Sequence, residues 1–184
     1  MKKILIFITV ALFLLTATPS IAAQAQVDDV RISLEPDFSV SFTVKNAFSE
    51  NIEEAIKSGV PTSFNFIVEL TRSRRLWFDQ EVGRWEFRHT VKYDTLKEEY
   101  KVILDEKGFV PVRTKDFGEM KSIMSSADAV TLEPMRRLAP GYNYQLRIMA
   151  ELHTVRLPFR LDYLLFFLKL WNVETDWYVY EFSL

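Results

Sequence analysis

Residues 38–70 read FSVSFTVKNAFSENIEEAIKSGVPTSFNFIVEL, and this stretch decides the fold. Apolar residues occupy every second position over 38–44 and again over 64–70, the pattern of two β-strands that each bury one face. Between them Ile52, Ala55 and Ile56 are spaced at i, i+3 and i+4, which predicts a short amphipathic helix. The stretch therefore predicts a strand, a helix and a second strand around one core.

The ends of this helix are marked by residues that favour helix termini. Asn51 can cap the first turn, and Glu54, three residues later, can complete a capping box. Gly59 suits the left-handed position after the last turn, and Pro61 prevents the helix from continuing. We therefore expect the helix to begin at Asn51 and to end before Gly59.

The rest of the chain is mostly alternating sequence punctuated by turns. Strand patterns occur over 30–34, 85–93, 100–104, 142–152 and 177–182. Phe109–Arg113 predicts a short edge strand because Pro111 lacks the backbone N–H that a central strand needs. Asp116, with Glu119 three residues later, predicts the capped start of a second helix. We expect a mainly β protein: an antiparallel β-sandwich of about eight strands with two short α-helices and an apolar C-terminal segment.

The N-terminus has the three parts of a secretory signal. Lys2 and Lys3 precede an apolar stretch over 4–15, and Ala23-Gln24-Ala25 is a small-residue cleavage site, with Ser20-Ile21-Ala22 as a competing one. The apolar stretch is too short for a membrane-spanning helix, which takes roughly 20 residues. We therefore expect residues 1–25 to be a cleaved signal peptide and residues 26–184 to form a single domain. The expected location is the periplasm, in free or membrane-associated form.

Composition limits the classes of function. The net charge is −2 and the chain has no cysteine, which argues against a nucleic-acid-binding surface and leaves no disulfide or thiol chemistry. The sequence contains neither a glycine-rich phosphate loop nor a metal-binding motif, so no cofactor is expected. Of the two histidines, His89 lies on the apolar face of its strand and is expected to be a hydrogen-bonded core residue, whereas His153 lies on a polar face. A hydrolase remains an alternative, because two catalytic carboxylates can meet in three dimensions without a sequence motif.

Two stretches are candidate binding surfaces. In the first, Arg72 and Arg74 lie near Trp77, and arginines beside aromatic residues can grip an anionic or sugar ligand. The alternative is that these arginines form the polar side of a strand, with their aliphatic stems covering a neighbour.

The second candidate is Leu161–Trp171, an almost continuously apolar stretch that includes Phe166, Phe167 and Trp171. As a helix it would be about 16 Å long, too short to span a bilayer. It is therefore expected to be a buried core helix, an interfacial anchor or a lid over an apolar pocket.

Several motifs resemble a known bacterial family. They are Asn46-Ala47-Phe48, the run from Glu53 to Pro61, Thr71-Arg72-Ser73-Arg74 with Trp77, Tyr93 followed by Tyr100, and Glu174-Thr175-Asp176-Trp177-Tyr178. The chain resembles the exported family called domain of unknown function 4390 over nearly all of its mature part. The resemblance implies no catalytic residues. Some members look to be encoded beside membrane sensor kinases, so such a kinase is a partner by family association only.

The leading expectation is an exported, non-catalytic envelope module that binds a protein or ligand through loops or an open sheet edge. The first alternative is a carrier of lipid or acyl chains, or a membrane-surface protein, that uses Leu161–Trp171. The hydrolase is the second alternative.

Overall fold

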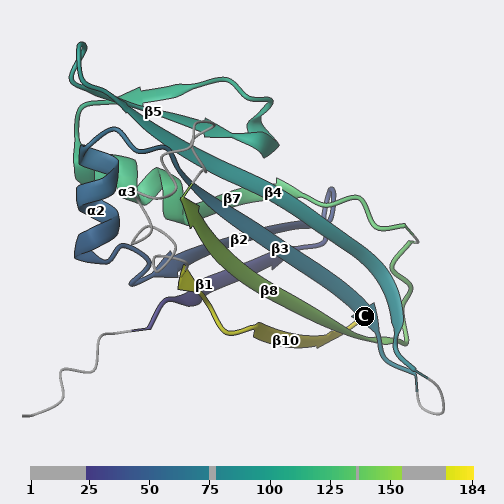
Figure 1. The fold of residues 1–184 in the computed structure, drawn as a ribbon. Helices are drawn as coiled ribbons and strands as arrows, with labels where there is room; N and C mark the ends of the chain where they lie inside the picture. Colours follow the sequence, from purple (N-terminus) through teal and green to yellow (C-terminus); the bar gives the residue numbers. More distant parts are fainter. Residues whose placement is uncertain (1–23, 75–77, 136, 155–172) are drawn as a thin grey trace, which may run out of the picture.

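The computed structural model describes residues 24–74, 78–135, 137–154 and 173–184, which form two antiparallel sheets and two α-helices (Figure 1). The small sheet has the strand order β1-β2-β7. Its strands are β1 (Gln26–Ser33), β2 (Ser39–Lys45) and β7 (Ser126–Thr131). Strands β1 and β2 pair antiparallel, so the expected opening hairpin is confirmed.

The large sheet has the order β10-β8-β3-β4-β5-β6, and all of its pairs are antiparallel. Its strands are β3 (Thr62–Arg72), β4 (Gln80–Asp94), β5 (Glu99–Leu104), β6 (Val112–Thr114), β8 (Asn143–Thr154) and β10 (Tyr178–Ser183), and the two-residue β9 (Val173–Glu174) also pairs with β8. The expected edge strand at Phe109–Arg113 begins only after Pro111, because Phe109 has a positive φ of 63° and leaves the extended conformation.

The two sheets face each other through aromatic rings on alternate positions of their strands. Phe42 of β2 lies edge-on to Phe66 of β3, with ring centroids 5.3 Å apart, and also contacts Phe87 of β4 at 6.4 Å. Phe42 and Phe66 are fully buried. Replacing such a side chain with alanine typically costs roughly 3–5 kcal/mol. The predicted antiparallel β-sandwich is confirmed, with the alternating residues of 38–44 and 64–70 in its core.

The first helix, α2 (Glu50–Lys57), starts one position earlier than expected. Its N-cap is Ser49 rather than Asn51, and no side chain caps its first turn, so the predicted capping box was wrong. Its end is as expected: Gly59 has φ of +82°, and the N–H groups of Gly59 and Val60 donate to the carbonyls of Ile56 and Ala55. This is the Schellman arrangement, which requires a residue that tolerates the left-handed region.

The second helix, α3 (Phe117–Ser125), has the expected N-cap: the Asp116 carboxylate accepts from the Glu119 N–H at 2.6 Å. In a complete capping box the Glu119 side chain would also accept from the Asp116 N–H, but here Thr114 takes that role. The Thr114 hydroxyl accepts from the Asp116 N–H and donates to the Glu119 carboxylate. The cap therefore also ties the end of β6 to the start of α3.

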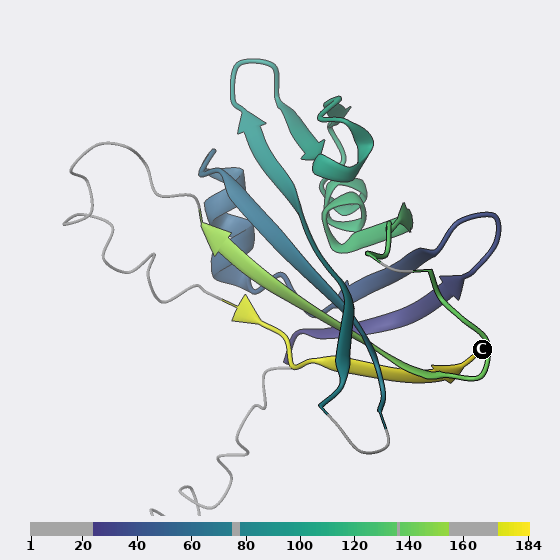
Figure 2. The same cartoon turned by 90° about the vertical axis from the view of Figure 1, so that its right-hand side faces the viewer.

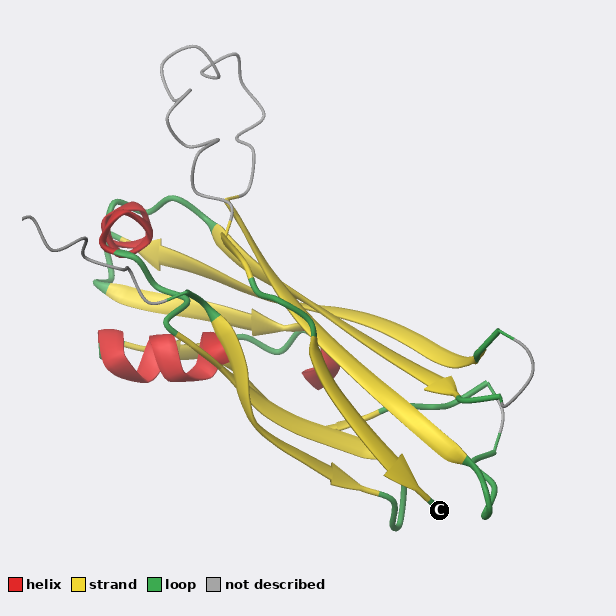
Figure 3. Cartoon of the chain, turned by 90° about the horizontal axis from the view of Figure 1, so that it is seen from below, coloured by secondary structure: helices red, strands yellow, loops and turns green. Residues whose placement is uncertain are grey.

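Helices α2 and α3 lie at one end of the sandwich, and the chain's C-terminus lies at the opposite end (Figures 1 and 3). Lys121 of α3 joins the two helices by an ion pair to Glu53 of α2 at 2.7 Å, and Lys57 lies 4.4 Å from the centre of the Phe117 ring. The hydrogen bond from Lys121 lowers the pKa of the Glu53 carboxyl. None of the helices in the described residues is long and apolar enough to cross a membrane.

Candidate functional site

The predicted arginines Arg72 and Arg74 meet at the end of the sandwich that carries the C-terminus. Arg72 is the last residue of β3 and lies in register with Gln80, the first residue of β4. The Nη2 atom of Arg72 donates to the Gln80 side-chain oxygen Oε1 at 2.6 Å, and Nη2 of Arg74 donates to the same oxygen at 2.5 Å. We call Arg72 and Arg74 the arginine pair. One uncharged oxygen thus serves two cations.

The surroundings of Arg72 fix its guanidinium in place. The guanidinium carbon lies over the Tyr142 ring, 4.3 Å from the ring centre, in a cation–π contact. Its Nε atom is buried, and none of the described residues offers it a hydrogen-bond partner. Asp79 accepts from the backbone N–H of Arg74 at 3.3 Å. Within the described ranges, neither arginine has a carboxylate within ion-pair distance.

The other predicted binding residues, Trp77, Phe166, Phe167 and Trp171, lie outside the described residues, as does the whole Leu161–Trp171 stretch. The structure therefore brings together Arg72 and Arg74 and does not place the rest. Sequence reasoning missed Gln80 and Tyr142. Neither stands in a recognisable motif, and only the pairing of β3 with β4 and β8 brings them beside the arginine pair.

His89 is a buried structural residue, as expected. Its side chain has no exposed surface and contacts the ring of Phe66 at a centroid distance of 4.8 Å. Its Nδ1 lies 3.1 Å from the Met124 carbonyl oxygen, near the end of α3, and its Nε2 lies 3.1 Å from Oε1 of Glu106. Because both ring nitrogens are used by the protein and the ring is enclosed, His89 is poorly placed to act on a substrate.

Glu106 is the acidic partner of His89. Burial raises the pKa of the Glu106 carboxyl, but the hydrogen bond and the charge from His89 outweigh burial and leave this pKa below its usual range. The pair links η1 (Asp105–Lys107) and α3 to β4.

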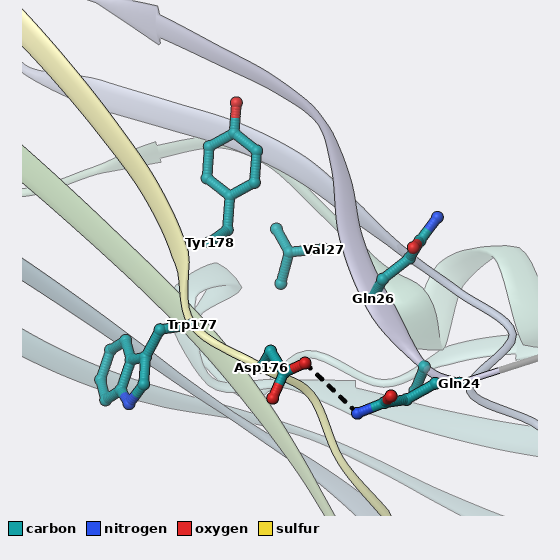
Figure 4. Close-up of a pocket in the computed structure, with 7 residues that line it drawn as sticks. Gln24, Gln26, Val27, Asp176, Trp177 and Tyr178 are labelled. Carbon is teal, nitrogen blue, oxygen red and sulfur yellow. Dashed lines mark hydrogen bonds between the residues drawn. The ribbon is translucent and has the colours of Figure 1, made fainter.

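A hollow of about 240 Å³ lies between the start of β1 and the start of β10 (Figure 4). Gln24 spans it by donating to Asp176 at 3.4 Å. Trp177, just before β10, points to the other side of the backbone, where the Arg147 guanidinium lies 4.3 Å from the centre of one of its rings. Among the described residues no group of three or more potential metal ligands occurs here or elsewhere. The hollow therefore offers the amide group of Gln24 and the carboxylate of Asp176 for binding.

Thr175 lies in the short segment between β9 and β10, which both pair with β8. It is 4 % exposed. Its N–H donates to the Ala150 carbonyl at 3.0 Å, and its hydroxyl accepts from the Ala150 N–H at 3.0 Å. One threonine thus satisfies both backbone groups of a buried β8 residue. It holds β9 and β10 against the same edge of β8.

Four edges end the two sheets in the described part, and three of them carry features that oppose further pairing. Strand β1 shifts register after Asp28, with Asp29 at a positive φ of 52°. Strand β7 shifts register around Ala129, which has a φ of 48°. Strand β6 has only three residues and follows Pro111. Bulges, short length and proline are the usual protections of edge strands.

Strand β10 is the regular edge. All six of its residues pair with β8 without a register shift, and it contains no proline, glycine, lysine or arginine. Val179 is 49 % exposed and Tyr180 is 44 % exposed. Figure 2 shows β10 beside β1, with the hollow of Figure 4 at the point where both strands begin.

Comparison with known proteins gives one result. A family model described as a domain of unknown function (DUF4390) matches residues 22–181, which include the described strands from β1 to most of β10. No curated protein and no solved structure matches the chain. The resemblance noted in the sequence is confirmed, and the chain belongs to the family called domain of unknown function 4390.

Proposed function

We propose that this family member is an exported, non-catalytic interaction module that binds an extended polypeptide segment by adding it as a strand to β10. The observation that carries the proposal is the contrast between β10 and the other edges. An unprotected edge presents unpaired backbone N–H and C=O groups, and strand addition to such an edge is a common mode of peptide recognition.

The side chains of β10 define what the added strand should look like. Tyr180 and Phe182 stack on one face with ring centroids 6.2 Å apart, and Phe182 stacks on Tyr144 of β8 at 5.5 Å. Val179 and Glu181 project from the opposite face, where Glu181 accepts from Gln145. A partner strand would lie about 4.8 Å from β10. We infer a partner segment that alternates apolar residues, packed on the aromatic row, with polar residues.

Export is the second part of the proposal and is supported by the leader-like N-terminus. The basic residues at 2 and 3, the apolar stretch over 4–15 and the small-residue site at 23–25 are the features of a secretory signal. The inferred partner is accordingly a protein of the cell envelope, and a membrane sensor kinase is the partner that family association favours.

The test is site-specific photocrosslinking in cells of the native host. A photoreactive phenylalanine analogue at Val179 is expected to form one discrete adduct with an envelope protein. The same analogue at Val112, which is 37 % exposed on the opposite, protected edge, is the matched control and should form none.

A second variant tests whether crosslinking at Val179 depends on the open edge of β10. Tyr180→Lys places a charge on the exposed edge and should abolish the Val179 adduct while leaving the melting temperature of the protein unchanged. Equal adducts from both edges, or a Val179 adduct unaffected by Tyr180→Lys, would overturn strand addition. An adduct between two copies of the chain would mean that the added strand comes from a second copy, in a homodimer, and not from a different envelope protein.

A further inference from the structure

We propose that the arginine pair, Arg72 and Arg74, forms with Gln80 a binding site for an oxyanion, supplied as free phosphate or as the phosphate of a lipid headgroup. The site lies at the end of β3, which β8 separates from β10. It rests on the geometry of the arginine pair and does not depend on the strand-addition proposal.

The first argument is electrostatic. Both Nη2 atoms donate to the single oxygen Oε1 of Gln80, so these two cationic nitrogens lie no more than about 5 Å apart, a separation at which like charges repel. An amide oxygen carries only a partial negative charge, so it compensates the two guanidinium charges poorly. An oxyanion in the position of Oε1 would replace repulsion with two charge-assisted hydrogen bonds.

The second argument is the unused donor on Arg72. Its Nε is buried, and no described residue accepts from it, although buried polar groups are nearly always hydrogen-bonded. The Nε and one Nη of a guanidinium form a fork that matches two oxygens of a phosphate. In Arg72 the Nη2 of such a fork is bound to Gln80 and the Nε is unused, and the guanidinium is held by its contact with the Tyr142 ring.

The third argument is the position of Gln80. It is the first residue of β4, in register with Arg72, so its backbone is held by the sheet while its side chain can turn away. We infer that Gln80 occupies the site in the absence of ligand and that the oxyanion displaces its amide oxygen. Replacing the amide with a carboxylate would then supply a permanent internal anion.

The inference is tested by thermal unfolding in increasing inorganic phosphate, compared with sodium chloride at matched ionic strength. Wild type should show a saturable, phosphate-specific rise in melting temperature. Arg74→Gln should weaken phosphate binding by about tenfold or more, as expected for one lost hydrogen bond to a charged group. Arg88→Gln, which removes an exposed arginine from the outer face of β4, is the matched control and should respond like wild type.

Gln80→Glu provides the decisive variant because it does not remove an arginine. It should melt at a higher temperature than wild type without phosphate and should no longer respond to phosphate. Flotation with vesicles containing phosphatidylglycerol identifies the source: binding lost in Arg74→Gln indicates a headgroup, whereas a phosphate response without vesicle binding indicates the free ion. Equal responses to phosphate and chloride, or an unchanged response in Arg74→Gln, would overturn the proposal.

Discussion

Thr175 provides a sharp test of how the last strands are held. Thr175→Val replaces the hydroxyl with a methyl group of nearly the same size, so the variant changes hydrogen bonding and leaves the packed volume almost unaltered. In wild type the hydroxyl is the acceptor for the Ala150 N–H, and both residues are buried, at 4 % and 2 % exposure. Valine cannot accept this bond, so the buried Ala150 N–H loses its acceptor.

The magnitude follows from the orphaned donor. A buried N–H without an acceptor costs about 1–3 kcal/mol, and each kcal/mol lowers the Tm of a domain of this size by about 2–4 °C. We therefore expect Thr175→Val to lower the free energy of unfolding by about 1–3 kcal/mol in urea titrations. Thr175→Ser keeps the hydroxyl and loses one methyl group, so it is the matched control.

Native-state hydrogen exchange gives an independent reading of the same bond. The Ala150 amide should exchange faster in Thr175→Val than in Thr175→Ser, because only the valine variant removes its acceptor. If the valine variant is as stable as wild type and its Ala150 amide stays protected, the hydroxyl is not the acceptor and the reasoning fails.

Three further results are expected. Gly59→Val should lower the unfolding free energy by about 1–2 kcal/mol, because a β-branched residue is strained at φ of +82°; an unchanged urea midpoint would contradict the left-handed helix end. The pKa of Glu106 is depressed in the folded state, so its contribution to stability is present above the unfolded carboxyl pKa and disappears as the pH falls through the lower folded value. Urea titrations over the acid range should accordingly show a shallower loss of stability for Glu106→Gln than for wild type, and parallel curves would rule this out. N-terminal sequencing of the exported protein should find Gln26 as the first residue, or Ala23 if the competing site is used, in which case the buried Ala25 stays in the mature chain; Met1 at the N-terminus would refute cleavage.

The strands and the C-terminal end of the first helix could be predicted because their cause is local. Alternation from 38 to 44 and from 64 to 70 reflects a sheet with one buried face, and Gly59 marks a backbone angle that other residues avoid. The cap at Asn51 was misplaced because the helix begins at Glu50 without any side-chain cap, so the capping pattern in the sequence does not mark this terminus.

Other features arise only from pairing between distant segments. Ile67 and Met149 point to the face that alternation assigns to solvent, yet both are buried at 6 % exposure, because they lie opposite each other on the two central strands β3 and β8. The arginine pair was identified from arginines that lie near an aromatic residue in the sequence. Its shared acceptor Gln80 follows six to eight residues later, across the connection between β3 and β4, but its covering ring Tyr142 comes from a distant segment that no local pattern contains.

The position of β3 has a consequence for how the chain acquires its fold. One edge of β3 pairs with the next strand along the sequence, but its other edge waits for β8, where Thr62 meets Thr154 and Arg72 meets Tyr144. Pairings between such distant segments slow folding, because a long loop must close before they form. Until residues 143–154 have been synthesised, a strand that buries eight of its eleven residues in the folded protein has an open edge, and the nascent chain is then most exposed to aggregation.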